Sequence, residues 1–188
     1  MPNFISEDDI EQAILQRLQH LHGFDVLDCF TKDKEDLKDG SNRKDKRDVI
    51  FSDRLKTAAI KLNPNIPEST IDDAIEKITA KRHTMSTIVA NKELDELIRD
   101  GVPVEYENEN GATEHEQVKL IDFKNPEQNE YLAVSQLWIK GERRFRRPDI
   151  LLYINGIPLV FIELKNSNVK LKSAYDDNLS NYQADIPQ

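Results

Sequence analysis

Two short and almost wholly apolar runs, at residues 150–154 and 159–162, constrain the fold of this chain more than any other feature. Only the four residues Asn155-Gly156-Ile157-Pro158 separate them. Continuous apolar runs of this length, bounded by turn residues, are typical of strands that are buried on both faces of a sheet. The sequence therefore predicts a tight hairpin inside an α/β domain.

Charged residues stand at the outer ends of both predicted strands. Asp149 comes directly before the first run, and Glu163 and Lys165 follow the second. Burying such charges is costly unless a cation or a partner compensates them. Because Mg²⁺ takes one or two carboxylates together with water and phosphate oxygens, Asp149 and Glu163 are candidate metal ligands. In the alternative interpretation, both carboxylates simply pair with Lys165 or with nearby arginines.

The connection between the two strands decides whether the carboxylates share a face. A two-residue loop at Asn155-Gly156 would leave Asp149 and Glu163 on opposite faces of the sheet. A one-residue bulge restores a shared face, on which Lys165 also projects, and glycine tolerates the positive φ that such a loop needs. Pro158 cannot donate to the ladder and also indicates irregularity. We therefore expect a bulged or three-residue connection.

This arrangement resembles the PD-(D/E)xK nuclease signature, an Asp after Pro on one strand and Glu-x-Lys on the next. In that superfamily the two carboxylates hold a divalent metal beside the scissile phosphate, and the lysine activates or orients the attacking water. The resemblance implies that Asp149 and Glu163 bind the metal and that Lys165 acts in catalysis.

A narrower resemblance covers about half of the chain. Residues 146–166 are similar to the nuclease core of the restriction (R) subunit of type I restriction-modification enzymes, with its Arg-Pro-Asp strand, Asn-Gly-x-Pro turn and Glu-Leu-Lys ending. Residues 131–138 resemble the preceding strand of that family. The opening from Ser6 resembles its first helix, whose glutamate points into the active site. Glu11 is the best match to this glutamate and Glu7 the second, so Glu11 is implied to complete the metal environment or to position Lys165.

The resemblance implies a Mg²⁺-dependent endonuclease, with Mn²⁺ as a substitute, that hydrolyses phosphodiester bonds of double-stranded DNA. In that family two ATP-driven translocase domains follow the nuclease domain, and the R subunit joins methylation and specificity subunits. The chain has no Gly-x-x-x-x-Gly-Lys-Ser/Thr loop. We therefore expect residues 1–188 to be a single nuclease domain from a longer subunit, with ATP bound only in the missing translocase domains. The alternatives are a stand-alone or repair-type nuclease of the same fold and a non-catalytic DNA-docking or assembly module.

The distribution of charge bears on DNA binding. The chain carries a net charge of −9, which weakens nonspecific binding to DNA, but residues 140–172 carry +5. The expected DNA contacts are Arg143, Arg144, Arg146 and Arg147, and by resemblance Tyr182. Related nucleases often carry Gln four residues before this tyrosine. Here the position is Asn178, whose side chain is shorter by one methylene.

The remaining pattern predicts a mixed central sheet flanked by helices. Helices are expected at 6–22, 48–62, 67–81, 86–99 and from about 173, with 48–100 as a helical insertion or layer. Strands are expected at 24–30 and 131–139, a hairpin at 102–106 and 116–123, and a mobile loop at 31–47. A single cysteine, no apolar run of about 18 residues and no targeting signal predict a cytoplasmic protein.

Overall fold

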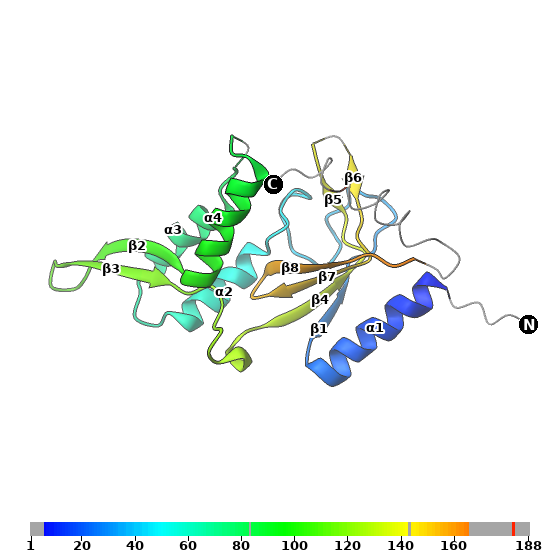
Figure 1. The fold of residues 1–188 in the computed structure, drawn as a ribbon, viewed down its shortest axis with the longest axis horizontal. Coiled ribbons are helices and arrows are strands. Elements are labelled where there is room, and N and C mark those ends of the chain that lie inside the picture. The colour runs from blue at the N-terminus through cyan, green and yellow to red at the C-terminus, as the bar shows by residue number, and fades with distance from the viewer. Residues whose placement is uncertain (1–5, 83, 143, 166–181, 183–188) are drawn as a thin grey trace, which may run out of the picture. The chain divides into compact units, whose positions relative to one another are not determined.

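The computed structural model describes residues 6–82, 84–142, 144–165 and Tyr182 (Figure 1). These residues form an α/β fold, as the sequence predicts, with a mixed four-stranded sheet and four α-helices. They divide into two compact units. The first unit holds residues 6–49, 131–153 and 158–165 together with Tyr182, and the second holds residues 50–130 and 154–157, apart from positions 83 and 143.

The first unit packs one helix against the sheet. Helix α1 (Glu7–His22) begins with the expected capping box, in which the Ser6 hydroxyl and the Asp9 carboxylate each accept a hydrogen bond from the other residue's N–H. It ends at Gly23, whose φ is 70°. Strand β1 (Asp25–Asp28) pairs in parallel with β4 (Tyr131–Ser135). Figure 1 shows α1 beside this sheet, and Leu15, Ala133 and Ile150 form the core between them.

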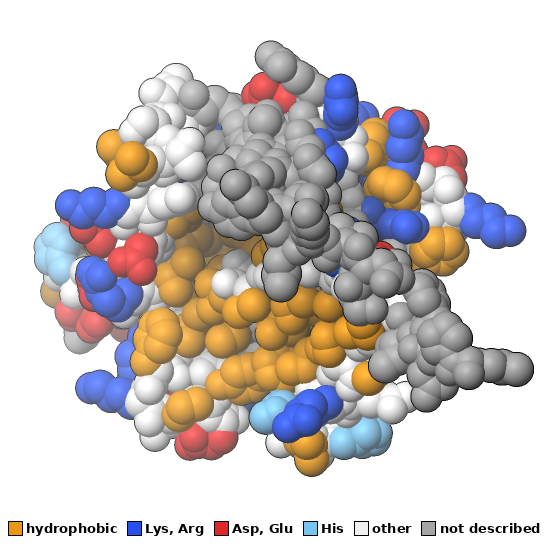
Figure 2. Space-filling view, turned by 45° about the vertical axis from the view of Figure 1, so that its right-hand side comes forward, with side chains coloured by type: hydrophobic (Ala, Val, Ile, Leu, Met, Phe, Trp, Pro, Cys, Tyr) orange, Lys and Arg blue, Asp and Glu red, His pale blue; other side chains and the backbone are white. Residues whose placement is uncertain are grey.

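The described sheet has the strand order β1-β4-β7-β8, with β7 at Ile150–Ile154 and β8 at Ile157–Ile162. The two apolar runs are therefore neighbouring strands, as predicted. Burial differs between them. Strand β7 is mostly buried, but Leu159, Val160 and Phe161 of β8 are 43%, 46% and 36% exposed. The prediction of burial on both faces is thus wrong for β8, because β8 lies at the edge of the described sheet. Figure 2 shows apolar side chains gathered on one face of the molecule.

The β7–β8 connection is a two-residue loop, so the predicted bulge or three-residue connection is wrong. Asn155 has a φ of 51° and Gly156 a φ of 81°. Two consecutive positive φ values are the signature of a type I′ turn, which Asn-Gly forms most readily. The buried Asn155 side chain holds the turn in place, since its amide donates to the Leu120 carbonyl and its oxygen accepts from the Glu130 N–H.

Substituting Gly156 tests how tightly this turn is packed. An added Cβ would lie 2.6 Å from the Phe51 carbonyl oxygen and 3.0 Å from the Leu55 nitrogen, which are backbone atoms. Gly111 has a similar φ of 75°, but a Cβ there would meet nothing within 4 Å. We expect Gly111→Ala to cost about 1 kcal/mol of unfolding free energy through its left-handed backbone alone. Gly156→Ala should cost roughly 1–3 kcal/mol more because of overpacking. Urea unfolding measures the free energy of unfolding of both variants. Equal losses for Gly156→Ala and Gly111→Ala would contradict the described packing around Gly156.

The second unit contains helices α2 (Ser52–Leu62), α3 (Glu68–Thr79) and α4 (Thr87–Asp100) and the hairpin β2 (Val102–Glu107) and β3 (Thr113–Val118). A short 3₁₀ helix spans Pro126–Gln128. The three predicted helices are confirmed, although the first begins at Ser52 rather than residue 48. The second hairpin strand begins three residues before the predicted one. A buried cluster that includes Leu55, Ile71, Ile78 and Val102 forms the core.

Residues 31–47, predicted from their charge to be a mobile loop, are anchored by a buried ionic network. Asp39 accepts hydrogen bonds from Arg43 at 2.9 Å and from Lys46 at 2.7 Å. Arg43 also donates to the carbonyl oxygen of Trp138 at 3.0 Å. All three charged side chains are at most 4% exposed. The charges of this segment therefore face inward in part, which composition alone does not reveal.

The predicted strand at 131–139 is interrupted. Strand β4 ends at Ser135, and Gln136 has a φ of 55°. The short strands β5 (Ile139–Lys140) and β6 (Phe145–Arg146) then form an antiparallel pair that the sequence pattern did not predict. The predicted helix from about 173 lies outside the described residues. Among the helices that the structure describes, none combines the length and apolar character needed to cross a membrane.

Candidate functional site

Asp149 stands directly before β7 and is held from two sides. Its Oδ2 accepts a hydrogen bond from the backbone N–H of Leu164 at 2.6 Å. On the other side, the backbone N–H of Gln136 donates to the Asp149 carbonyl at 3.0 Å, and Gln136 Nε2 lies 3.5 Å from Asp149 Oδ1. The Asp149 carboxylate is therefore fixed between the end of β4 and the segment that follows β8.

Glu163 and Lys165 lie just beyond the end of β8 at Ile162, not on the strand itself. Strand alternation therefore does not place their side chains, and the expectation based on a shared strand face does not apply. The two side chains still meet, because Lys165 Nζ lies 3.4 Å from Glu163 Oε1. The Asp149 hydrogen bond to Leu164 brings this pair beside Asp149, so the three residues singled out by the sequence come together.

Glu11 reaches the same region from α1. It is only 6% exposed, and its Oε2 accepts a hydrogen bond from Gln136 Nε2 at 2.5 Å. Gln136 thus links Glu11 to Asp149. Glu7, one turn earlier on α1, is exposed, although its charge still acts on Glu163. Glu11 is therefore connected to Asp149 through a shared hydrogen-bond donor.

Carboxylates in this cluster repel one another. Burial raises the pKa of the Glu163 carboxyl above its ordinary value, and the negative charge of Asp149 raises it further. Burial also raises the pKa of Glu11; the Gln136 hydrogen bond lowers it in part, and Asp149 raises it again. Both shifts show that burial and the neighbouring carboxylates disfavour negative charge here, although Lys165 lowers the pKa of Glu163 in part.

The donor set fits a hard divalent cation. Within the residues that the structure describes, no group of three or more His, Cys, Asp or Glu side chains is arranged so that it could hold a metal ion. Mg²⁺ does not require such a group, because it commonly takes one or two carboxylates and fills its remaining positions with water and substrate phosphate. Asp149 and Glu163 offer carboxylate oxygens of this kind, and a cation between them would relieve their repulsion.

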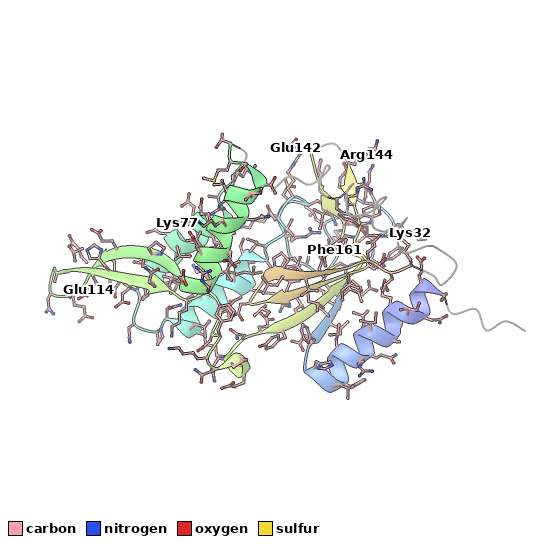
Figure 3. All side chains as sticks on the ribbon, viewed as in Figure 1. Lys32, Lys77, Glu114, Glu142, Arg144 and Phe161 are labelled. Atoms are coloured by element: carbon pink, nitrogen blue, oxygen red, sulfur yellow. The ribbon has the colours of Figure 1, made fainter. Side chains whose placement is uncertain are left out.

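Several arginines lie in the segment that leads to Asp149. Arg144, exposed in the β5–β6 turn, is labelled in Figure 3. The Arg146 guanidinium lies 5.5 Å from the centre of the Tyr182 ring. The Arg147 guanidinium lies 4.9 Å from the Trp138 ring and 5.4 Å from the Phe30 ring. Figure 2 shows Lys and Arg side chains at the upper right, with acidic side chains among them. Arg143 and Asn178 lie outside the described residues.

Tyr182 lies close to the candidate site. Its ring centre is 4.8 Å from that of Phe161 on β8, which Figure 3 labels. Burial raises the pKa of the Tyr182 hydroxyl well above its ordinary value, and the charges of Glu163 and Asp149 add to this shift. The structure therefore brings Tyr182 together with the two carboxylates.

Gln136 belongs to this cluster and was not predicted from the sequence. The only signal for it is its place directly after an apolar strand, at the same edge where other polar residues gather. A single glutamine in that position does not identify a functional residue. Its backbone conformation and its two carboxylate neighbours become visible only in three dimensions.

Comparisons with known proteins agree with the sequence resemblance. Residues 4–188 match the family described as "Type I restriction enzyme R protein N terminus". The chain is 40% identical over 163 residues to the endonuclease subunit of the type I restriction enzyme HindI of Haemophilus influenzae. It is 31% identical over 191 residues to a Methanocaldococcus jannaschii protein named as the MjaIXP endonuclease subunit of such an enzyme. These matches cover 86% and 95% of this chain but only 15% and 17% of the relatives.

Proposed function

The chain belongs to the family of type I restriction enzyme R protein N termini, and we propose that it is a metal-dependent endonuclease domain that hydrolyses DNA phosphodiester bonds. One observation carries this proposal: Asp149, Glu163 and Lys165 come together beyond the ends of adjacent strands, with Glu11 reaching the same cluster from α1. We further propose that the sheet and α1 form a PD-(D/E)xK nuclease core.

Each residue has a proposed part in hydrolysis. Asp149 and Glu163 would hold Mg²⁺, for which Mn²⁺ can substitute, and a bound cation would supply Lewis acidity toward the phosphate and the attacking water. Lys165 orients this water or stabilises the negative charge that develops on the phosphate. Its contact with Glu163 keeps the ammonium group at the cluster. Glu11 completes the carboxylate environment from α1.

DNA would approach through the basic residues next to the carboxylates. Arg144 and Arg146 are proposed to contact phosphates, together with Arg143 outside the described residues. Arg147 lies over two aromatic rings, and its guanidinium N–H groups are proposed to donate to a DNA phosphate. Tyr182 is the proposed aromatic contact beside them.

The relatives extend the proposal to a larger enzyme. The two quoted relatives are named as endonuclease subunits and are several times longer than this chain. We propose that the chain acts in the cytoplasm as the nuclease part of such a subunit, together with ATP-driven translocase domains and with methylation and specificity subunits. Recognition and ATP use would then lie elsewhere, and double-stranded DNA would be cut without sequence preference at the cleavage point.

Lys165→Met in the complete subunit, assembled with its partner subunits, tests the proposal. The substitution keeps the apolar stem and removes the charge, so we expect DNA cleavage to fall by roughly 10²–10³-fold. ATP hydrolysis should stay unchanged, because the proposed ATP site lies elsewhere. Lys92→Met on α4, where the side chain is 77% exposed, is the matched control and should leave both activities unchanged. Full cleavage by Lys165→Met would refute the catalytic assignment.

A further inference from the structure

Gln136 adopts a backbone conformation that its residue type rarely takes. Its φ is 55°, in the left-handed region. In the described part of the chain, the other two non-glycine residues at positive φ are Asn42 and Asn155, and asparagine tolerates this region far better than glutamine does. The left-handed conformation is disfavoured for glutamine because its Cβ approaches the following carbonyl oxygen. Glycine would form the same backbone without this cost, so the glutamine side chain is the distinctive feature of the position.

That side chain joins two carboxylates. Gln136 Nε2 lies 2.5 Å from Glu11 Oε2 and 3.5 Å from Asp149 Oδ1. The backbone N–H of Gln136 also donates to the Asp149 carbonyl. The left-handed turn at the end of β4 therefore presents one amide group to an acid on α1 and to the acid that precedes β7.

An amide suits this position for an electrostatic reason. A lysine or arginine between the two acids would neutralise them and compete with a cation for the same oxygens. The side-chain amide of glutamine donates hydrogen bonds but carries no charge. It can orient both carboxylates while leaving their negative charge available. The Leu164 N–H acts similarly on the second oxygen of Asp149.

We propose that Gln136 is a positioning residue of this site, whose amide holds the carboxylates of Glu11 and Asp149 in the orientation that a divalent cation requires. The inference rests on the proposed function, since it assumes that these carboxylates serve a cation. Its strained backbone is then the means by which the amide reaches both acids. Residues that orient metal ligands in this way typically change metal affinity 10–100-fold when they are replaced.

Calorimetric titration of the 188-residue chain with Mn²⁺ alone tests the proposal. Gln136→Asn introduces a residue that tolerates positive φ and keeps the amide group, but its side chain is shorter by one methylene. Gln136→Gly removes the side chain and relieves the backbone. We expect both variants to bind Mn²⁺ about 10-fold or more weakly than wild type. Without metal, their melting temperatures should stay within about 3 °C of wild type, since no core side chain is lost.

Two further variants give each outcome one meaning. Asn42 is also left-handed but is exposed. Asn42→Gly therefore removes a similar backbone strain elsewhere in the chain, and its Mn²⁺ affinity should equal that of wild type. Asp149→Asn should abolish binding. If both Gln136 variants bind like wild type while Asp149→Asn does not bind, the role of Gln136 is refuted and the proposed function stands. If both variants melt much lower, Gln136 is a structural residue and the proposal fails. Failure of wild type to bind, or undiminished binding by Asp149→Asn, would overturn both.

Discussion

Asp149→Asn is expected to abolish DNA cleavage by the complete enzyme, with a loss of about 10³-fold or more, and to remove Mn²⁺ binding by this chain. The substitution removes a full negative charge from the proposed metal site. The asparagine side-chain oxygen still accepts the hydrogen bond from the Leu164 N–H, and the weak contact with Gln136 Nε2 at 3.5 Å is the one that is lost. The effect should therefore appear in chemistry and metal affinity rather than in folding.

Cleavage of plasmid DNA and calorimetry with Mn²⁺ measure the two effects, and thermal unfolding of the metal-free chain checks the fold. Asp95→Asn on α4 is the matched control, because its carboxylate is 68% exposed and pairs only with Arg99 at 2.9 Å among the contacts described. That variant should cleave and bind like wild type. Normal cleavage by Asp149→Asn would mean that the carboxylate cluster is structural and that the family's nuclease activity resides elsewhere in the longer subunit.

Asp39→Asn is expected to destabilise the chain by roughly 3–5 kcal/mol, the typical result of removing one partner of a buried ion pair. Arg43 and Lys46 would remain buried beside an uncharged side chain. Asp45→Asn in the same segment is the control, since Asp45 and Arg47 form an exposed pair with side chains 49% and 52% exposed. Asp45→Asn should lower the free energy of unfolding by no more than about 1 kcal/mol. Urea unfolding at neutral pH separates the two cases, and similar losses would show that the network is not buried.

The same carboxylate makes stability depend on pH in a defined direction. Burial by itself raises the pKa of Asp39, but hydrogen bonds from Lys46, Ser41 and Arg43 outweigh it and hold the pKa at about 2, below its ordinary value of 3.8. The folded state therefore binds the proton more weakly than the unfolded state. Its stabilising contribution is complete above pH 3.8 and is lost as the pH falls toward 2. Asp39→Asn should flatten the acid limb of the stability curve in this window.

Local patterns in the sequence predicted the elements of the site well. The apolar runs predicted β7 and β8, and the capping box predicted the start of α1. The resemblance singled out Glu11, whose role in the site stays a prediction. The hairpin connection was predicted wrongly, because we required Asp149 and Glu163 to share a strand face. The Asn155-Gly156 pair favoured the type I′ loop that forms. Both carboxylates lie beyond the strand ends, where alternation no longer decides how side chains point.

Other features depend on contacts that no local pattern contains. Arg43 binds the carbonyl of Trp138, far along the chain, so the buried network could not be inferred from the charge of residues 31–47. The exposure of β8 follows from its edge position in the described sheet, which its apolar sequence conceals. Gln136 acquires its importance only because β4 ends beside Glu11 and Asp149.

The pairing of β1 with β4 has a consequence for how the chain folds. These parallel neighbours, in which Asp25 pairs with Leu132, are separated in sequence by residues 50–130, the main segment of the second unit. Bringing them together closes a loop of about 100 residues, whose entropic cost grows with the logarithm of its flexible length. The second unit holds its own ends close, since Arg54 forms an ion pair with Glu130. Once it has folded, the flexible part of the loop is short, so early formation of the helical unit would accelerate assembly of the sheet that carries Asp149.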